Sequence, residues 1–439
     1  MLSMLEQPTL FYSIQHRTYY SLTFVLAELT LIMAQVNKST KQLQQGSIEF
    51  IALMASLMSV VALAIDALLP ALDVIGLAMR TQSATENQLI ITMIFLGLGI
   101  GPLIFGPLSD NLGRKPVVYM GFILFLAASF VCVSAESIQY MIAGRILQGI
   151  GLSAPRTISI AIIRDQYQGD PMARIMSFVT VVFLLVPIVA PALGKMVLDY
   201  FDWQSIFLMQ LWCSGAVAIW FWKRQPETLD PDHKRPLDIK DYVHGLGEVI
   251  RQPKTMGYTL VSGLVFGSFM VYLSGAQQIF HDQYNLKEEF PLIFAGLSIA
   301  IGLAIFSNGH LVLRFGMKKM VTTAMYGFFA VALTYVLLFY GKDNPSIEIL
   351  MVFFGLQFFA IGFLFGNLRA LAMQPMGHIA GMAAAITGFI STIMALPIST
   401  YIGTYIDHHV WPIFLGFTIC GALSMIVMII IDKMASKNS

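Results

Sequence analysis

Twelve apolar runs, each long enough to cross a lipid bilayer as an α-helix, constrain the fold of this chain more than any other feature. A helix needs about 20 predominantly apolar residues to cross the hydrocarbon core. The runs lie at residues 48–70, 88–108, 116–134, 138–160, 175–197, 205–223, 256–278, 290–312, 319–340, 347–368, 381–403 and 411–431. Only 12% of the 439 residues are charged, against about 25% in soluble domains. The sequence therefore predicts an all-α polytopic membrane protein with twelve transmembrane helices.

The positions of the basic residues predict the orientation. With the residues before the first run placed inside, the inside segments hold 21 of the 26 Lys and Arg, and the outside loops hold four. Such a bias toward one side of the membrane sets topology. We expect both termini and the polar stretch 224–255 to be cytoplasmic. A net charge of +1 gives no reason to expect a nucleic-acid partner.

An internal repeat divides the chain into two halves. The stretch GPLSDNLGRK, starting at Gly106, shares Gly, Leu, Gly and Lys at equal offsets with GHLVLRFGMK, starting at Gly309. Both copies join the second and third predicted helices of a half, which indicates two pseudo-symmetric six-helix halves. Parallel halves of this kind place the substrate site near the midplane between them.

The predicted organisation has five parts. They are an N-terminal extension (1–46), a first six-helix half (47–223), a linker (224–255), a second half (256–431) and a tail (432–439). The extension contains an apolar stretch that is interrupted by Glu28 and is short for a span. We expect the extension to be cytoplasmic or interfacial, with a thirteenth span as the alternative.

The first copy of the repeated loop carries charge as well as glycine. Gly106 and Gly113 allow close approach and a sharp turn. Asp110 is expected to bond the N–H groups at a neighbouring helix N-terminus, and Arg114 and Lys115 to face the negative inner leaflet. The hypothesis is a gate that holds the two halves together on the cytoplasmic side. The alternative is a loop that serves only topology.

Several motifs, in order along the chain, resemble the major facilitator superfamily. GPLSDNLGRKP resembles its signature loop, Arg145 to Gly151 its fourth-helix R-x-x-Q-G-x-G motif, and PIVAPALG, with Pro187, Pro191 and Gly194, its antiporter-associated fifth helix. DALLPAL, starting at Asp66, resembles the D-M-Y-L-P-A-L of the Bcr/CflA drug-efflux family. The resemblance covers residues 48–431 and implies the major facilitator fold, with proton-driven export of small organic compounds across a bacterial inner membrane.

The chain departs from the family pattern at several positions. Lys195 stands where a second glycine is usual, and Leu68 removes an aromatic hydroxyl beside Asp66. Gln277 and Gln278 replace a proline and an aromatic residue in the seventh helix. We expect cavity or substrate contacts from five residues: Gln148, Arg156, Gln277, Gln278 and Asn367. Arg369, near the inner end of the tenth helix, is interpreted as a topology anchor.

Asp66 and Arg145 are the strongest candidates for proton coupling. A charged side chain at the centre of a membrane helix costs about 2.5–3.5 kcal/mol on insertion scales, so it faces a cavity or a partner. Pro70 removes the helical N–H donor for the Asp66 carbonyl, so the helix should be weak there. The two residues lie at similar depth, and a direct contact or a water bridge is expected. Alternatives are a wetted helix end for Asp66 and a structural hydrogen-bonding hub for Arg145.

Export by proton antiport is the leading function. The alternatives are proton-coupled uptake of a metabolite and a membrane enzyme or sensor. No nucleophile–base pair, phosphate-binding loop or metal-ligand spacing supports catalysis. We expect no cofactor besides the proton gradient and no metal site. The expected partners are a small-molecule substrate, protons and lipid, and the superfamily resemblance suggests a monomer.

Overall fold

The computed structural model describes residues 45–234, 239–406 and 409–437. The chain divides into a unit of residues 1–52, of which only 45–52 are described, and a compact unit of residues 53–439. The predicted extension, 1–46, falls almost wholly outside the described residues. All contacts given below lie within the second unit.

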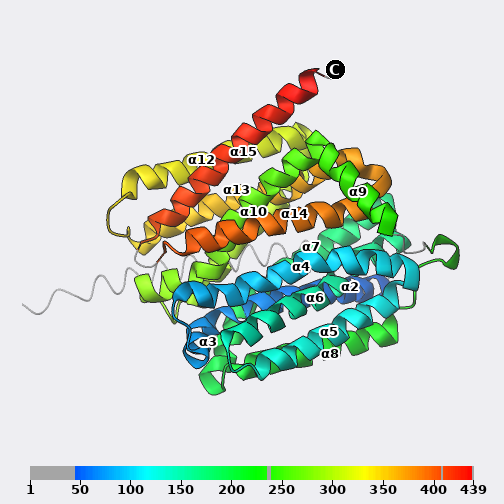
Figure 1. Ribbon diagram of the computed structural model, residues 1–439, viewed down its shortest axis with the longest axis horizontal. Coiled ribbons are helices and arrows are strands. Elements are labelled where there is room, and N and C mark those ends of the chain that lie inside the picture. The colour runs from blue at the N-terminus through cyan, green and yellow to red at the C-terminus, as the bar shows by residue number, and fades with distance from the viewer. Residues whose placement is uncertain (1–44, 235–238, 407–408, 438–439) are drawn as a thin grey trace, which may run out of the picture. The chain divides into compact units, whose positions relative to one another are not determined.

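The described residues of the first predicted half form eight helical elements (Figure 1). They are α2 (Gln45–Asp66), the 3₁₀ turn η1 (Leu69–Ala71), α3 (Leu72–Met79), α4 (Ala84–Leu112), α5 (Arg114–Val133), α6 (Ile138–Gln166), α7 (Gly169–Tyr200) and α8 (Gln204–Arg224).

The linker and the second predicted half add ten elements. They are η2 (Pro231–His233), α9 (Ile239–Arg251), α10 (Pro253–Gln277), the π-turn η3 (Gln278–Gln283), α11 (Phe290–Phe315), α12 (Met317–Phe339), α13 (Ile347–Met373), the 3₁₀ turn η4 (Gln374–Ile379), α14 (Ala380–Gly403) and α15 (Trp411–Lys437).

The prediction of twelve membrane helices is confirmed. Eleven helical runs in the described residues are long and apolar enough to cross a membrane, and one of them, Ile347–Gly403, contains both α13 and α14. We call the ends of the helices near Arg80 and Gly341 the outer end, following the predicted orientation. The opposite end, which holds Gly113 and Gly316, is the inner end.

The two repeated loops have matching backbone conformations. Gly113 and Gly316 each separate two helices with a positive φ, 111° and 78°, a region that residues other than glycine enter at a steric cost. Two residues on, Lys115 bonds the carbonyl of Trp222 on α8 at 2.9 Å, and Lys318 pairs with Asp432 on α15 at 2.8 Å. In each half the loop therefore contacts the last helix of the same half, which is what two copies of one plan require.

Close helix packing within the first half depends on glycine. A Cβ atom on Gly149 of α6 would overlap the carbonyl oxygen of Ile94 and come within 3.0 Å of the Cα atom of Gly97, both on α4. The backbones of α4 and α6 therefore touch directly, which small residues permit inside a membrane.

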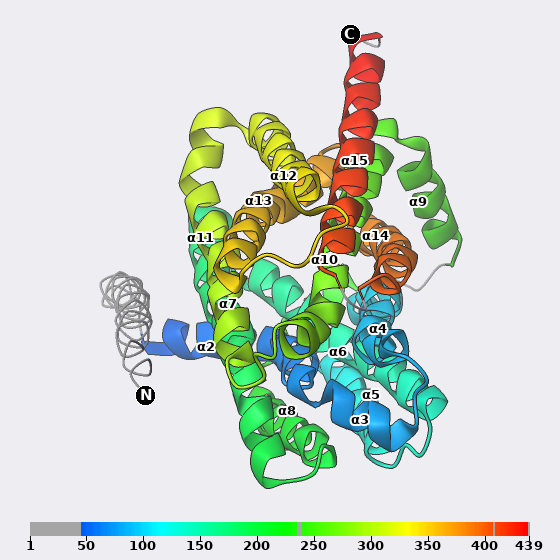
Figure 2. The same cartoon turned by 90° about the vertical axis from the view of Figure 1, so that its left-hand side faces the viewer.

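Two helix pairs join the halves along their length. α4 packs against α14, and α7 packs against α11 (Figures 1 and 2). Near the inner end, Leu103 of α4 packs onto a cluster that includes Ala383 and Ile386 of α14 and Val249 of α9. Apolar contact therefore closes this part of the seam between the halves.

The linker contains a helix that the sequence analysis missed. α9 occupies residues that were interpreted only as a polar connection. Its Val249 is fully buried, and Glu248 binds His378 of η4 at 2.6 Å. One face of α9 therefore packs on the second half. The many charged residues of the linker gave no sign of this helix, because they lie on its other faces.

Candidate functional site

The first transmembrane helix breaks at Asp66, as Pro70 predicted. α2 ends at Asp66, and the chain continues through the short turn η1 before α3 begins. The N–H of Ala67 still donates to the carbonyl of Leu63 at 3.2 Å, whereas Ala71 donates to Leu68 in a tighter turn. The carboxyl side chain of Asp66 thus lies at a helix end inside the bundle rather than within a regular helix.

The surroundings of Asp66 are apolar and include a residue from the other half. Asp66 is 5% exposed, and in the described part of the chain no hydrogen bond or ion pair reaches its carboxylate. α10 of the second half packs against the turn η1 that follows Asp66, and Tyr272 of α10 interacts electrostatically with Asp66. Its hydroxyl is buried and has no hydrogen-bond partner among the described residues. Tyr272 thus supplies, from the second half, an aromatic hydroxyl near Asp66 of the kind that Leu68 had removed.

The antiporter-like motif on α7 contacts the same break. Pro187 and Pro191 lie inside α7 without ending it. A Cβ atom on Gly194 would overlap the carbonyl oxygen of Ala67, the residue after Asp66. Only a residue without a side chain lets α7 approach this backbone so closely. The motif therefore packs against the break at Asp66.

Arg145 organises a buried hydrogen-bond network. Its guanidinium is 0% exposed and donates to the carbonyl of Ile90 at 2.8 Å, the carbonyl of Ala64 at 3.1 Å and Oε1 of Gln148 at 2.8 Å. Gln148 in turn donates to Ser129 at 2.7 Å. Arg145 thus ties α6 to α2 and α4, and this geometry matches the structural hub left open by the sequence.

The structure shows no direct contact between Arg145 and Asp66, one of the two arrangements expected, and it places Gln148 away from a cavity. Arg145 makes no direct contact with Asp66: its Nε and Nη1 groups donate to backbone carbonyls of α4 and α2 and to Gln148, and its buried Nη2 group has no hydrogen-bond partner among the described residues. Gln148 does not face a substrate cavity, since it is fully buried between Arg145 and α5.

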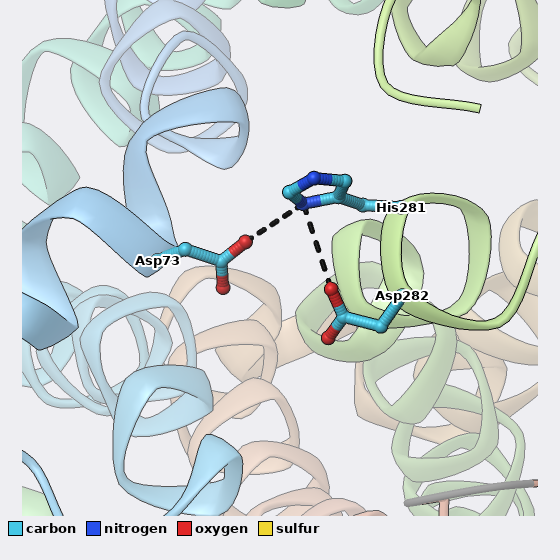
Figure 3. A group of neighbouring side chains, drawn as sticks. All are labelled: Asp73, His281 and Asp282. Atoms are coloured by element: carbon cyan, nitrogen blue, oxygen red, sulfur yellow. Dashed lines mark hydrogen bonds and ion pairs between the residues drawn. The ribbon is translucent and has the colours of Figure 1, made fainter. Parts of the chain in front are cut away.

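A cluster of polar residues joins the halves at the outer end; we call it the outer cluster. Nδ1 of His281 lies 2.9 Å from Oδ2 of Asp73 and 3.6 Å from Oδ1 of Asp282 (Figure 3). Gln277 donates to the same Asp73 oxygen at 2.8 Å. Asp73 of α3 is therefore held by two residues from the far end of the seventh predicted helix.

Further polar contacts at the outer end cross the same seam. Gln88 of α4 donates to Oε1 of Gln278 at 3.0 Å, and Lys195 of α7 pairs with Glu288 at 2.8 Å. Gln277 and Gln278 were expected to line a cavity, but here they bond to the opposite half. Asp73, His281 and Asp282 have the side-chain types of a divalent-cation site, yet hydrogen bonds to His281 and Gln277 already account for the position of Asp73.

Replacing Gln277 by glutamate should open the outer cluster. The new carboxylate would face Oδ2 of Asp73 at hydrogen-bond distance, and two like charges about 4 Å apart repel by about 1 kcal/mol even in water. We expect amide hydrogen exchange in residues 69–79 and 278–283 to accelerate at least fivefold. The control Gln277→Met removes the hydrogen bond without adding charge, so it should have a smaller effect. Equal exchange in the glutamate variant and the wild type would contradict a role in closure.

At the inner end, Arg114 is the centre of an ion network within the first half. Its guanidinium binds Asp110, Asp165 at 2.9 Å and the Ser109 hydroxyl at 2.9 Å. Arg114 is only 4% exposed. The expectation that Arg114 faces the lipid surface was therefore wrong, because its planar fork of donors is matched by two carboxylates.

Glu227, from the linker, completes this network. Its carboxylate accepts the backbone N–H groups of Arg114, Lys115, Thr228 and Leu229, each at 2.9 Å. Partial burial opposes its ionisation, but the four N–H donors outweigh that effect and lower the pKa of Glu227. The anion at the N-terminus of α5 is therefore Glu227, in the place where an anion is favoured.

The predicted gate is corrected by these contacts. Asp110 was expected to cap a neighbouring helix and to hold the halves together, but its described partner is Arg114, one turn along the chain. Gly106 was expected to permit close helix approach, yet no atom of another helix lies within 4 Å of where its Cβ would be. The network links α4, α5, α6 and the linker, and in the described residues it does not reach the second half.

Two candidate substrate residues remain, Asn367 and Arg156. Asn367 is buried and donates to Oδ1 of Asn308 on α11 at 2.7 Å, so its amide serves helix packing rather than a substrate. Arg156 is half-buried on α6.

Comparison with known proteins agrees with this architecture. A family model described as Major Facilitator Superfamily matches residues 50–398. A Bicyclomycin resistance protein homolog of Haemophilus influenzae is 26% identical over 244 residues, which are 55% of this chain and 61% of that protein. A Multidrug resistance protein MdtL of Shewanella oneidensis is 25% identical over 80% of this chain and 88% of its own length. The crystal structure of a D-xylose-proton symporter matches 87% of this chain and 96% of its own, with a TM-score of 0.66 and 14% identity, which speaks to the fold alone.

Proposed function

Because this chain belongs to the Major Facilitator Superfamily and is therefore an integral membrane transporter rather than an enzyme, we propose that it exports small organic compounds in exchange for protons. The observation that carries the proposal is Asp66. It is a buried carboxyl group at a helix break in the bundle, 5% exposed. A carboxyl group in such a place takes up and releases protons with the access of water, and it costs the protein about 2.5–3.5 kcal/mol to keep charged.

The contacts around Asp66 support coupling between protonation and movement. Tyr272 approaches it from the second half, and Gly194 packs on the backbone that follows it. A change of charge at Asp66 therefore alters a contact between the halves. In our proposal the proton enters from the outer end once the outer cluster opens, and the protonated carboxyl group releases the substrate there.

The drug-like nature of the substrate rests on the relatives. The two relatives described above are named for bicyclomycin resistance and multidrug resistance. We propose accordingly that the compounds are small, largely apolar organic molecules. We also propose that the protein works as a monomer in a bacterial inner membrane, with both termini in the cytoplasm and the proton gradient as its only energy source.

Proton flux in inside-out membrane vesicles tests the proposal. The vesicles are energised so that the lumen becomes acid, and a panel of neutral and charged compounds, chloramphenicol included, is added while lumenal pH is followed. An exporter that exchanges drug for protons should raise lumenal pH only when a substrate is present. A fall in lumenal pH on adding substrate at zero gradient would instead indicate symport, and no response to any compound would reject multidrug export.

A further inference from the structure

The linker helix α9 leaves an apolar face uncovered. Three of its large apolar side chains are exposed: Val243 by 65%, Leu246 by 41% and Ile250 by 52%. They are spaced by three and four residues, so they lie one above another along a single face of the helix. We call these three residues the apolar stripe of α9. Exposed apolar side chains that gather in this way, rather than lying scattered, indicate a surface that meets something other than water.

The remaining surface of α9 divides into a packed side and a polar side. Val249 is fully buried, and a Cβ atom on Gly245 would overlap the sulfur atom of Met382 on α14. The polar side holds three exposed residues: Lys240, His244 and Arg251. At roughly 100° per residue, the apolar stripe lies between the packed side and the polar side. α9 therefore presents its protein contact, its apolar surface and its polar surface on three separate faces.

α9 lies at the rim of the bundle, at the level where the membrane-spanning helices begin. It ends at Arg251, and the membrane-spanning helix α10 begins at Pro253. α9 packs against α14, and Figure 2 shows it beyond α14 at the edge of the bundle. Ile393 follows Met382 by eleven residues, about three turns, so the two share one face of α14, and Ile393 is exposed within the membrane-spanning run. The face of α14 that α9 covers therefore continues into a surface that faces lipid.

A helix of this size and pattern can lie in the membrane interface but cannot cross the membrane. Its 13 residues extend over about 20 Å, whereas a hydrocarbon core is about 30 Å thick. An amphipathic helix in the interface buries its apolar face about 5–10 Å deep, at the boundary between headgroups and acyl chains. Residues 239–251 hold two basic and two acidic side chains. Apolar burial, rather than net charge, therefore supplies the affinity of α9 for the interface.

The position of the apolar stripe favours lipid over a protein partner. Ile250 stands only three residues before the first residue of α10, so its end of the stripe lies at the membrane boundary. A soluble protein or a second copy of this chain, seated on the stripe, would have to displace the lipid headgroups there.

We propose that α9 lies in the headgroup region at the inner end of the bundle, with its apolar stripe inserted among the first segments of the acyl chains. The partner of this surface is the lipid bilayer itself. Val249 of the same helix belongs to the cluster, including Leu103, that closes the seam between the halves. Lipid thus holds in place a helix that takes part in this closure. The proposal applies whatever compound is transported, so it does not depend on the proposed export.

Fluorescence quenching by spin-labelled lipids tests the depth of the apolar stripe. The full-length protein carries Cys213→Ser, because Cys213 is exposed and the other two cysteines are buried. One further change, Val243→Cys, Leu246→Cys or Ile250→Cys, receives an environment-sensitive fluorophore. The protein is placed in phosphatidylcholine vesicles whose doxyl-labelled lipid carries its label near the headgroup end or near the methyl end of an acyl chain. We expect the headgroup-end label to quench each of the three positions at least twofold more than the methyl-end label.

His244→Cys is the matched control, because His244 is exposed on the polar side of the same helix. The headgroup-end label should quench it at least threefold less than Leu246→Cys. In the labelled Ile250→Cys protein, Leu246→Glu should reduce quenching, since a charged group resists insertion, whereas His244→Glu should leave quenching unchanged. Because three positions are labelled independently, misfolding of one variant does not decide the outcome.

Three results would overturn the proposal. The first is equal quenching of His244→Cys and the apolar stripe, or no quenching of the stripe by either lipid label. The second is quenching of the fluorophores by one another that rises with protein density, which would assign the stripe to a second copy. The third is quenching by lipid only after phosphatidylglycerol is added, which would assign the contact to charge rather than to apolar insertion.

Discussion

Asp66→Asn should abolish substrate-driven proton flux while leaving the protein folded. The amide has almost the same shape as the carboxyl group, but it cannot take up or release a proton. Since no described residue forms a hydrogen bond or ion pair with the Asp66 carboxylate, the substitution breaks no contact that holds the helices together. We expect the rate of lumenal pH change on adding substrate to inside-out vesicles to fall at least a hundredfold.

Asp343→Asn is the matched control. It makes the same chemical change outside the bundle, because Asp343 lies exposed between α12 and α13. It should retain wild-type flux. Detergent-purified Asp66→Asn should be as monodisperse as the wild type, which would separate lost coupling from lost folding. Full proton flux in Asp66→Asn would place the proton site elsewhere.

Gly149→Ala should prevent stable folding, although it adds a single methyl group. The new Cβ would overlap the carbonyl oxygen of Ile94, and the neighbouring atoms are backbone, which cannot rotate away as a side chain can. Overpacking of a core costs about 1–3 kcal/mol, and more where nothing can yield. The contact between α4 and α6 would have to widen along its length. We expect little or no monodisperse protein after purification, or a fall in melting temperature of about 10 °C.

Gly215→Ala provides the control, since Gly215 lies inside α8 and no atom of another helix lies within 4 Å of the added carbon. Alanine favours a helix over glycine by about 0.8–1.0 kcal/mol, so this variant should be as stable as the wild type or more so. Similar yield and melting temperature for Gly149→Ala and Gly215→Ala would show that α4 and α6 do not need direct backbone contact.

Local features were predictable from the sequence because their causes lie within a few residues. Pro70 removes a donor four residues back, so the break at Asp66 was predicted correctly. The repeated glycines predicted two matched turns, and Gly113 and Gly316 share a positive φ. Apolar length predicted all twelve membrane helices.

Partners distant in the sequence were not predictable, because they depend on which helices pack together. Arg114 and Asp165 are 51 residues apart, and Glu227 lies 113 residues from Arg114. The sequence assigned Arg114 to lipid and gave Glu227 no role. Tyr272 was likewise missed as a neighbour of Asp66, since only the packing of the two halves brings them together. Its hydroxyl, buried in an apolar helix, was the one available signal.

The matching contacts of Lys115 and Lys318 have a structural consequence for how the two halves are held together. Each lysine binds the last helix of its own half, Lys115 by a hydrogen bond and Lys318 by an ion pair. Each half is therefore stabilised by a contact of its own. Because each contact lies within one half, a movement of one half relative to the other would break neither of them. The contacts that would have to break are those between the halves. They are the hydrogen bonds to Asp73 at the outer end and the apolar packing of Leu103 near the inner end. The loop that the sequence suggested was a gate between the halves is therefore better described as a brace within each half.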